Sequence, residues 1–158
     1  MNRLALRLAV IALAQLSLVG VAVAPRISAR LTGEEYRLRV EPVDPIDPFR
    51  GAYVDLAYPD LPQQGRDISG STDGRVYVTL QRDGDVWRAA GWSRTRPDHA
   101  PYLMCDDSDW RLRCGIESWW LPQGKASAVQ DAVAAGRAVA VVKVDSRGHA
   151  ALVRVEVS

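Results

Sequence analysis

The feature that most limits how this chain can fold is an apolar run near its start. Within Leu8–Ala24 the only polar side chains are Gln15 and Ser17. As a helix the run spans about 26 Å, and extending it back across Arg7 reaches the roughly 30 Å of a bilayer core, because Arg can snorkel to the headgroups. The run is apolar on every face, unlike an amphipathic helix packed on a soluble domain. We therefore expect residues 4–24 to contact a lipid bilayer.

Two fates of this segment remain open. The sequence Val21-Ala22-Val23-Ala24 fits the small-x-small pattern of a signal-peptide cleavage site. Pro25 follows that site, however, and proline is a poor residue after a scissile bond, so we favour an uncleaved single-pass anchor in the cytoplasmic membrane. Two arginines flank the run on each side, which specifies its orientation only weakly. Either fate places residues 31–158 outside the cytoplasm.

Charge divides the 158-residue chain at the same point. Residues 1–30 hold four arginines and no acid, whereas residues 31–158 hold the other 16 of the 20 basic side chains and all 19 acidic ones. We therefore separate a signal-like membrane anchor (1–30) from one globular domain (31–158), whose length suits a single core. The balance of charge in the domain excludes a nucleic-acid-binding surface, and no small-molecule ligand can be identified.

Alternating apolar and polar residues predict a mainly β domain. We expect strands at 36–41, 52–58, 76–81, 86–92, 138–144 and 150–157, with extended chain at 110–121. Asp83-Gly84 predicts a tight hairpin turn, and residues 59–74 and 94–109 read as irregular. Residues 125–135 predict one helix that ends at Gly136. The expected fold is α+β: an antiparallel β sandwich or partly closed barrel with one packed helix, preceded by a transmembrane helix.

Residues 42–58, PVDPIDPFRGAYVDLAY, resemble the signature of the GDYXXLXY family of bacterial membrane-anchored proteins. That family is named for Gly-Asp-Tyr-x-x-Leu-x-Tyr, and the matching positions here are Gly51, Tyr53, Leu56 and Tyr58. A second match is Gly115-Ile116-Glu117, followed by Trp119-Trp120. The resemblance covers about residues 36–157 and implies an anchored extracytoplasmic β domain, without an established activity.

This chain departs from the family pattern at one position. The name-giving Asp falls on Ala52, so no carboxylate chemistry can be assigned there. Alternation places Ala52 on the apolar face of its strand with Val54 and Leu56, where a small apolar residue is a reasonable structural replacement. The departure suggests that the Asp of the family is not an indispensable catalyst.

The densest polar constellation is Asp44, Asp47 and Arg50 in the proline-rich loop. It could be a binding or catalytic loop with paired carboxylates. The simpler interpretation is a proline-rigid turn whose Asp side chains accept backbone N–H groups, with Arg50 paired to Glu117. We therefore expect the motif residues, including Gly115, to have a structural role rather than a binding role.

Cys105 and Cys114 are the only cysteines, and outside the cytoplasm an even number favours a disulfide over two buried thiols. No metal site or cofactor is expected, because His99 and His149 are not at ligand-like spacing. The cluster Asp106, Asp107 and Asp109 lacks the register of a calcium loop and predicts a solvated acidic tip.

Two functions compete. The first is a non-enzymatic accessory or partner-binding module of the bacterial cell envelope, whose partner is an integral membrane protein. The second is an envelope hydrolase or ligand-binding enzyme that uses the Asp44–Arg50 loop. The chain has no Gly-x-Ser-x-Gly elbow, and only Lys125 and Lys143 could serve as a lysine base. We therefore assign no catalytic residue and favour the first function.

Overall fold

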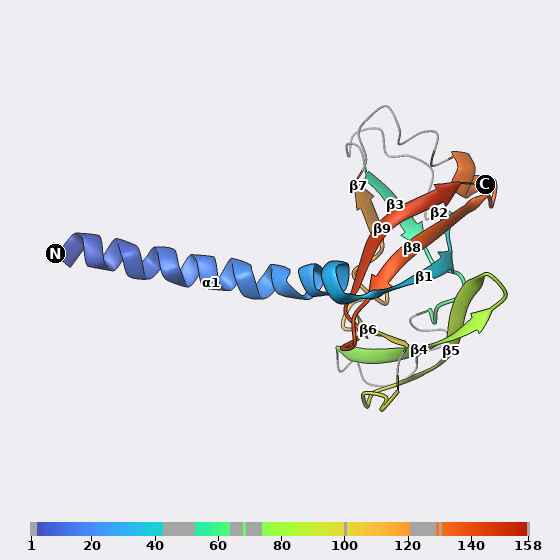
Figure 1. Ribbon diagram of the computed structural model, residues 1–158, viewed down its shortest axis with the longest axis horizontal. Helices are drawn as coiled ribbons and strands as arrows, with labels where there is room; N and C mark the ends of the chain where they lie inside the picture. The colour runs from blue at the N-terminus through green and yellow to red at the C-terminus, as the bar shows by residue number, and fades with distance from the viewer. Residues whose placement is uncertain are drawn as a thin grey trace.

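The computed structural model describes residues 3–42, 53–63, 68, 74–99, 101–120, 129 and 131–157. In these ranges a long helix projects from a domain of antiparallel strands (Figure 1). The elements are α1 (Arg3–Thr32), β1 (Glu34–Arg39), β2 (Glu41–Pro42), β3 (Tyr53–Ala57), β4 (Arg75–Asp83), β5 (Val86–Ser93), β6 (Tyr102–Asp106), β7 (Ser118–Trp120), β8 (Ala138–Val144) and β9 (Ala150–Val157).

Helix α1 continues past the apolar run, with Pro25 inside it rather than at its end. It stops at Gly33, whose amide donates to the carbonyl oxygen of Ala29 at 3.0 Å. A Cβ at position 33 would lie 2.8 Å from the amide nitrogen of Val144. Only glycine therefore lets the chain leave the helix this close to β8 and enter β1 directly.

The first sheet has the order β1-β8-β9, with both pairs antiparallel. Tyr36 and Leu38 of β1 are buried while the intervening charged residues are exposed, which confirms a strand with one wet face. In β8, Ala140, Val141 and Val142 are all buried across a register shift between the two valines. This strand is covered on both faces, which agrees with its nearly continuous run of Ala and Val.

The second sheet has the order β5-β4-β6. The predicted Asp83-Gly84 hairpin is confirmed: Asp83 is paired with Val86, and Gly84 has a φ of +63°. The expectation that residues 94–109 are irregular was wrong for β6, which pairs with the other edge of β4. Leu103 of this strand lies in the core. Pro97 and Pro101, which suggested an irregular segment, both lie in the loop before the strand.

The third sheet has the order β2-β3-β7. Extended chain at 110–121 is only partly confirmed, because β7 is a strand of three residues and an isolated bridge joins Asp106 to Arg113. β2 is a short strand that the sequence pattern did not separate from β1. It pairs Glu41 with Ala57 across the sheet.

In the predicted helix, the described residues 129 and 131–134 are helical, and Ala132 and Val133 are buried. Gly136 has a φ of +66°, its amide donates to the carbonyl oxygen of Val133, and the amide of Arg137 donates to that of Ala132. These two bonds form a Schellman motif, so the predicted glycine cap is confirmed.

All three sheets and the segment before β7 share one core. Leu38, Leu56, Val78, Leu103 and Ile116 are each at most 2% exposed. The fold is α+β, with a long apolar helix at the amino end and three antiparallel sheets. The described strands do not close into a barrel.

Candidate functional site

The two segments that carry the family resemblance lie side by side. The amide of Leu56 in β3 donates to the carbonyl oxygen of Glu117 at 2.7 Å. The buried hydroxyl of Tyr58 donates to the carbonyl oxygen of Ile116, also at 2.7 Å. Residues about sixty positions apart in the sequence therefore form one structural unit at the third sheet.

The remaining residues of the first motif are only partly described. Tyr53 lies in β3, where its backbone is opposite Trp120 of β7. The other predicted site residues of this motif lie outside the described ranges: Asp44, Asp47, Arg50 and Gly51. The choice between a binding loop and a proline-rigid turn, and the predicted pairing of Arg50 with Glu117, stay predictions.

The side chain of Glu117 accepts hydrogen bonds from backbone amides of its own turn. Its carboxylate accepts the amide of Gly115 at 3.0 Å and also the amide of Cys114. Gly115 has a φ of +81°, a backbone conformation that favours glycine, so the Gly-x-Glu motif encodes a turn. Burial, and then the nearby charge of Glu117, raise the pKa of Tyr58 far above its ordinary value. The phenol consequently stays protonated as a donor to the backbone.

A disulfide fixes this turn to the second sheet. Cys105 of β6 is bonded to Cys114, and both residues are buried. Beside it, the backbone of Asp106 exchanges two hydrogen bonds with that of Arg113, at 2.7 and 2.8 Å. The covalent bond and the bridge together tie the edge of β6 to the Gly-x-Glu turn.

The acidic segment after β6 is not a solvated tip throughout. Asp107 is 1% exposed, and its carboxylate accepts two bonds from the guanidinium of Arg94, at 2.6 and 2.9 Å. It also accepts the amide of Gly74 at 3.2 Å. The bond from Arg94, against the opposing effect of burial, holds the pKa of Asp107 below its ordinary value. The prediction was wrong here because the partner comes from the loop after β5.

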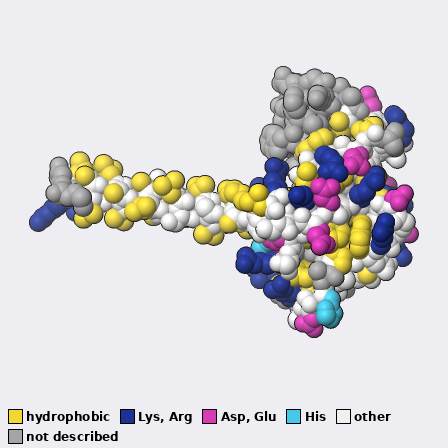
Figure 2. All heavy atoms as spheres, in the orientation of Figure 1, with side chains coloured by type: hydrophobic (Ala, Val, Ile, Leu, Met, Phe, Trp, Pro, Cys, Tyr) yellow, Lys and Arg dark blue, Asp and Glu magenta, His cyan; other side chains and the backbone are white. Residues whose placement is uncertain are grey.

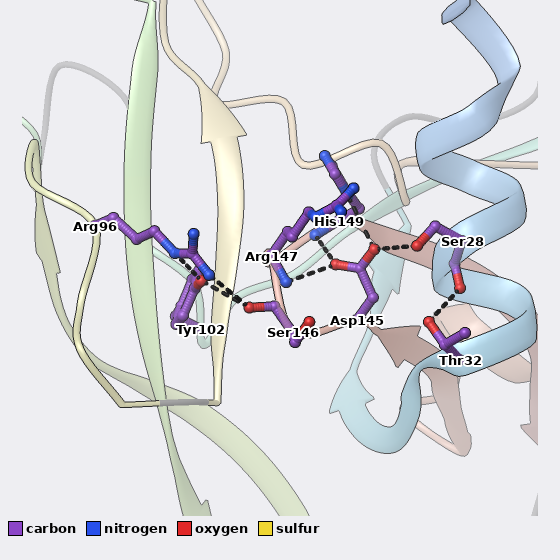
Figure 3. A network of polar contacts seen from close by, with 8 residues as sticks. All are labelled: Ser28, Thr32, Arg96, Tyr102, Asp145, Ser146, Arg147 and His149. Carbon is purple, nitrogen blue, oxygen red and sulfur yellow. Dashed lines mark hydrogen bonds and ion pairs between the residues drawn. The ribbon is translucent and has the colours of Figure 1, made fainter. Parts of the chain in front are cut away.

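A second buried carboxylate joins α1 to the domain (Figure 3). Asp145, in the turn between β8 and β9, accepts the Ser28 hydroxyl at 2.6 Å. The same carboxylate contacts His149 Nδ1 at 3.0 Å and accepts the amides of Arg147 and His149 at 2.9 and 3.0 Å. One side chain therefore organises the hairpin turn and holds the last turns of the helix.

This Ser–Asp–His cluster has the wrong order for hydrolysis. In a catalytic triad the imidazole lies between the hydroxyl and the carboxylate and takes the hydroxyl proton. Here the carboxylate of Asp145 lies between Ser28 and His149, so His149 does not contact the hydroxyl. Burial raises the pKa of Asp145, but the bonds from Ser28, His149 and two backbone amides outweigh it and lower that pKa overall. The cluster therefore stabilises the ionised carboxylate of Asp145 in a fixed position.

The same hairpin turn is tied to β6 on its other side (Figure 3). The carbonyl oxygen of Ser146 accepts the Tyr102 hydroxyl at 3.0 Å and the guanidinium of Arg96 at 3.0 Å. Gly148 is essential to this contact, since a Cβ there would lie 2.6 Å from the ring of Tyr102. The turn is therefore held between α1 and the second sheet.

Next to this joint, α1 and the domain enclose an open groove of about 260 Å³. Arg26 and Arg30 line one wall, and the Gly115–Trp119 segment and the start of β9 line the other. Arg30 donates to the carbonyl oxygen of Leu152 at 3.4 Å, and its own carbonyl oxygen accepts the ammonium of Lys143 at 3.2 Å. The groove combines guanidinium groups, a hydroxyl and a half-buried indole.

Sequence reasoning did not find the Asp145 cluster or the groove. Asp145 could have been read as a turn residue that bonds nearby amides, but its partner Ser28 is 117 positions away. Among the described residues, no three His, Cys, Asp or Glu side chains are grouped so that they could hold a metal ion. The described clusters position elements and leave one groove open to a ligand.

Comparison with known proteins gives one match. A family model described as GDYXXLXY protein matches residues 15–155, which is most of the chain and includes the second half of the apolar run. No curated protein and no solved structure matches.

Proposed function

The chain belongs to the GDYXXLXY protein family, and from that premise we propose that it is an anchored partner-binding module of the bacterial cell envelope. In this proposal α1 crosses the cytoplasmic membrane once, the β domain lies outside the cytoplasm, and the partner is an integral membrane protein. The module binds and positions that partner and catalyses no reaction.

The observation that carries the proposal is the exposure of α1. The helix is long and apolar enough to span a membrane, and none of its most apolar stretch is buried. In Figure 2, hydrophobic side chains cover the helix between its two ends, whereas those on the domain are surrounded by charged residues. Such a surface is stable in lipid or against another apolar helix.

The anchor is also continuous with the domain. Ala29 is fully buried, Ser28 is bonded to Asp145, and the helix passes into β1 through Gly33 alone. A tether with a flexible linker would let the domain move freely above the membrane. This joint instead holds the domain at a set orientation, which suits a module that presents a surface to a neighbour.

The helix carries a face on which another helix can pack closely. Ser17, Gly20 and Ala24 are spaced by three and four residues and share one side. A Cβ added at Gly20 would meet nothing within 4 Å, so the fold of this chain does not require glycine there. Glycine lowers helix stability by about 1 kcal/mol relative to alanine, whereas small residues let transmembrane helices approach. This face is the proposed contact with the partner.

Photocrosslinking in native membranes tests the partner proposal. A photoreactive residue at Ser17 is expected to give a crosslinked species heavier than the monomer. Gly20→Leu fills the small face and should abolish that species, whereas Val19→Leu places the same side chain outside that face and should leave it. Recovery of monomer alone from the unmodified chain would contradict the proposal.

Two further measurements test the membrane position. Residues 31–158 are proposed to lie outside, where an oxidising environment supports the Cys105–Cys114 disulfide. Protease added to intact spheroplasts should therefore digest the domain. Amino-terminal sequencing of the membrane fraction should give the intact start, and a fragment that begins at Pro25 would show that the anchor is removed.

A further inference from the structure

The groove between α1 and the domain lies where the headgroups of a bilayer would be. The apolar run ends at Ala24, and Arg26 and Arg30 follow about 3 Å and 9 Å further along the helix axis. The headgroup layer on each side of the hydrocarbon core is about 5–8 Å thick. If α1 spans the membrane as proposed above, both guanidinium groups reach this layer.

The two arginines face the same space. They are one helical turn apart, both line the groove, and both side chains are exposed. Arg26 makes no hydrogen bond or ion pair with another described residue. With the described residues, the Arg30 guanidinium makes only a long bond, 3.4 Å, to the carbonyl oxygen of Leu152, so most of its five donors stay available. Two guanidinium groups at this spacing suit the oxygens of one phosphate.

The opposite wall fits the same ligand. Ser118 lines the groove, but its hydroxyl already donates to the carboxylate of Asp55 at 3.1 Å. Trp119 beside it is half-buried, and its amphipathic ring is of the kind enriched at membrane interfaces. Among the described residues that line the groove, Glu117 is the one acidic residue, and two backbone amides already bind its carboxylate. Lys143 adds a positive charge at the end of the helix, where backbone carbonyls would otherwise repel an anion.

We propose that this groove binds the phosphate of one membrane phospholipid, held by Arg26 and Arg30, with its glycerol backbone against Trp119. The inference rests on the membrane position in the proposed function. It adds a ligand class and a specific contact between the domain and the bilayer. Through this contact the lipid would help to hold the domain against the membrane surface.

Native mass spectrometry of the full-length chain, purified in a mild non-ionic detergent and incubated with phosphatidylglycerol, tests the groove. The wild-type chain should retain one phospholipid after the detergent is removed. Arg26→Gln/Arg30→Gln should lower the retained fraction about tenfold or more, because two charge-assisted contacts are lost. Arg26→Gln alone should also lower it, and this residue has no described bond whose loss could unfold the domain.

The chain provides a matched control at the other end of the same helix. Arg3 and Arg7 have the same spacing and charge but no domain beside them (Figure 1). Arg3→Gln/Arg7→Gln should therefore retain the lipid as the wild type does. Equal retention by all variants, or equal loss, would overturn the proposal. Displacement of the lipid by millimolar inorganic phosphate would also overturn it, because the groove would then be a binding site for free phosphate rather than for a phospholipid.

Carbonate extraction of native membranes separates this inference from the proposed function. If the wild-type chain stays in the membrane but the arginine variants retain lipid as the wild type does, the lipid site in the groove is refuted and the anchor is not. A chain that carbonate releases would refute the anchor, whatever lipid it binds in detergent.

Discussion

The two ends of α1 have the same local chemistry and different surroundings. Each end carries two arginines four residues apart, Arg3 and Arg7 at the start and Arg26 and Arg30 near the finish. At the first end every described side chain is exposed, whereas at the second Ala29 is fully buried and Ser28 contacts Asp145. The same sequence pattern is thus an open helix end in one place and one wall of a groove in the other.

This difference shows what gives each part of the helix its position. The first part of α1, residues 3–24, has only exposed side chains, so its location depends on its surroundings, and it is long and apolar enough to span a membrane. The last two turns are positioned by a buried carboxylate and a glycine against β8. The following predictions test that division.

The largest expected effect comes from a charge in the first part. Leu16→Arg places a guanidinium near the middle of the apolar run, which costs about 2.5–3.5 kcal/mol on insertion scales. We expect the variant to shift markedly from the membrane to the soluble fraction in carbonate extraction. Val153→Arg adds the same group at an exposed position of β9 and should not change the partition. Equal behaviour of the two variants would show that α1 is not inserted.

The next largest effect comes from the joint. Asp145→Ala removes the acceptor for Ser28 and for two backbone amides in a buried turn, so we expect a loss of about 2–3 kcal/mol in the free energy of unfolding. Denaturant unfolding measured by tryptophan fluorescence checks it. Glu156→Ala removes an exposed carboxylate from the same sheet and should cost under about 1 kcal/mol.

Acid should weaken the same joint more gently. The pKa of Asp145 is lower in the folded chain than in the unfolded one, so its contribution is complete above about pH 4, the ordinary value for Asp, and is lost as the pH falls towards the folded pKa. We expect Asp145→Asn to flatten the pH dependence of stability below about pH 4. The slope should not disappear, because the pKa of Asp107 is also lowered. An unchanged slope would contradict the assignment.

The smallest effect compares two serines of one helix. Ser28→Ala deletes a single hydroxyl that donates to Asp145, and a loss of about 1 kcal/mol in domain stability is expected. Ser17→Ala makes the same change in the exposed part and should leave the unfolding curve of the domain in place. If both variants destabilised the domain equally, the first part of α1 would be packed as well.

Much of the fold follows from local pattern. The alternation of β1, the turn at Asp83-Gly84 and the cap at Gly136 are each decided by residues that are adjacent in sequence. Strand β6 escaped prediction because Tyr102, Leu103 and Cys105 are all buried, so no polar alternation marks it between the proline-containing loop before it and the acidic segment after it. Its identity as a strand comes from pairing with β4.

The candidate sites were less accessible to sequence reasoning. The sequence identified the motif residues Leu56, Tyr58, Gly115 and Glu117. In the structure, the amide of Leu56 and the hydroxyl of Tyr58 each donate to a backbone carbonyl oxygen of the segment that holds the second motif. Asp145 and Asp107 are buried because of partners from other elements, Ser28 and Arg94. No property of the two acidic segments alone distinguishes these carboxylates from solvated ones.

The sequence by itself determined that this chain has an apolar helix followed by an antiparallel β domain, since hydrophobic periodicity and turn residues act over a few positions. Only the tertiary structure decided which charges are buried and which remain free. The cost of burying a charge depends on partners that arrive from distant parts of the chain, as Ser28 does for Asp145. For the same reason, only the fold could separate the second arginine pair, which lines a groove, from the first, around which every described side chain is exposed.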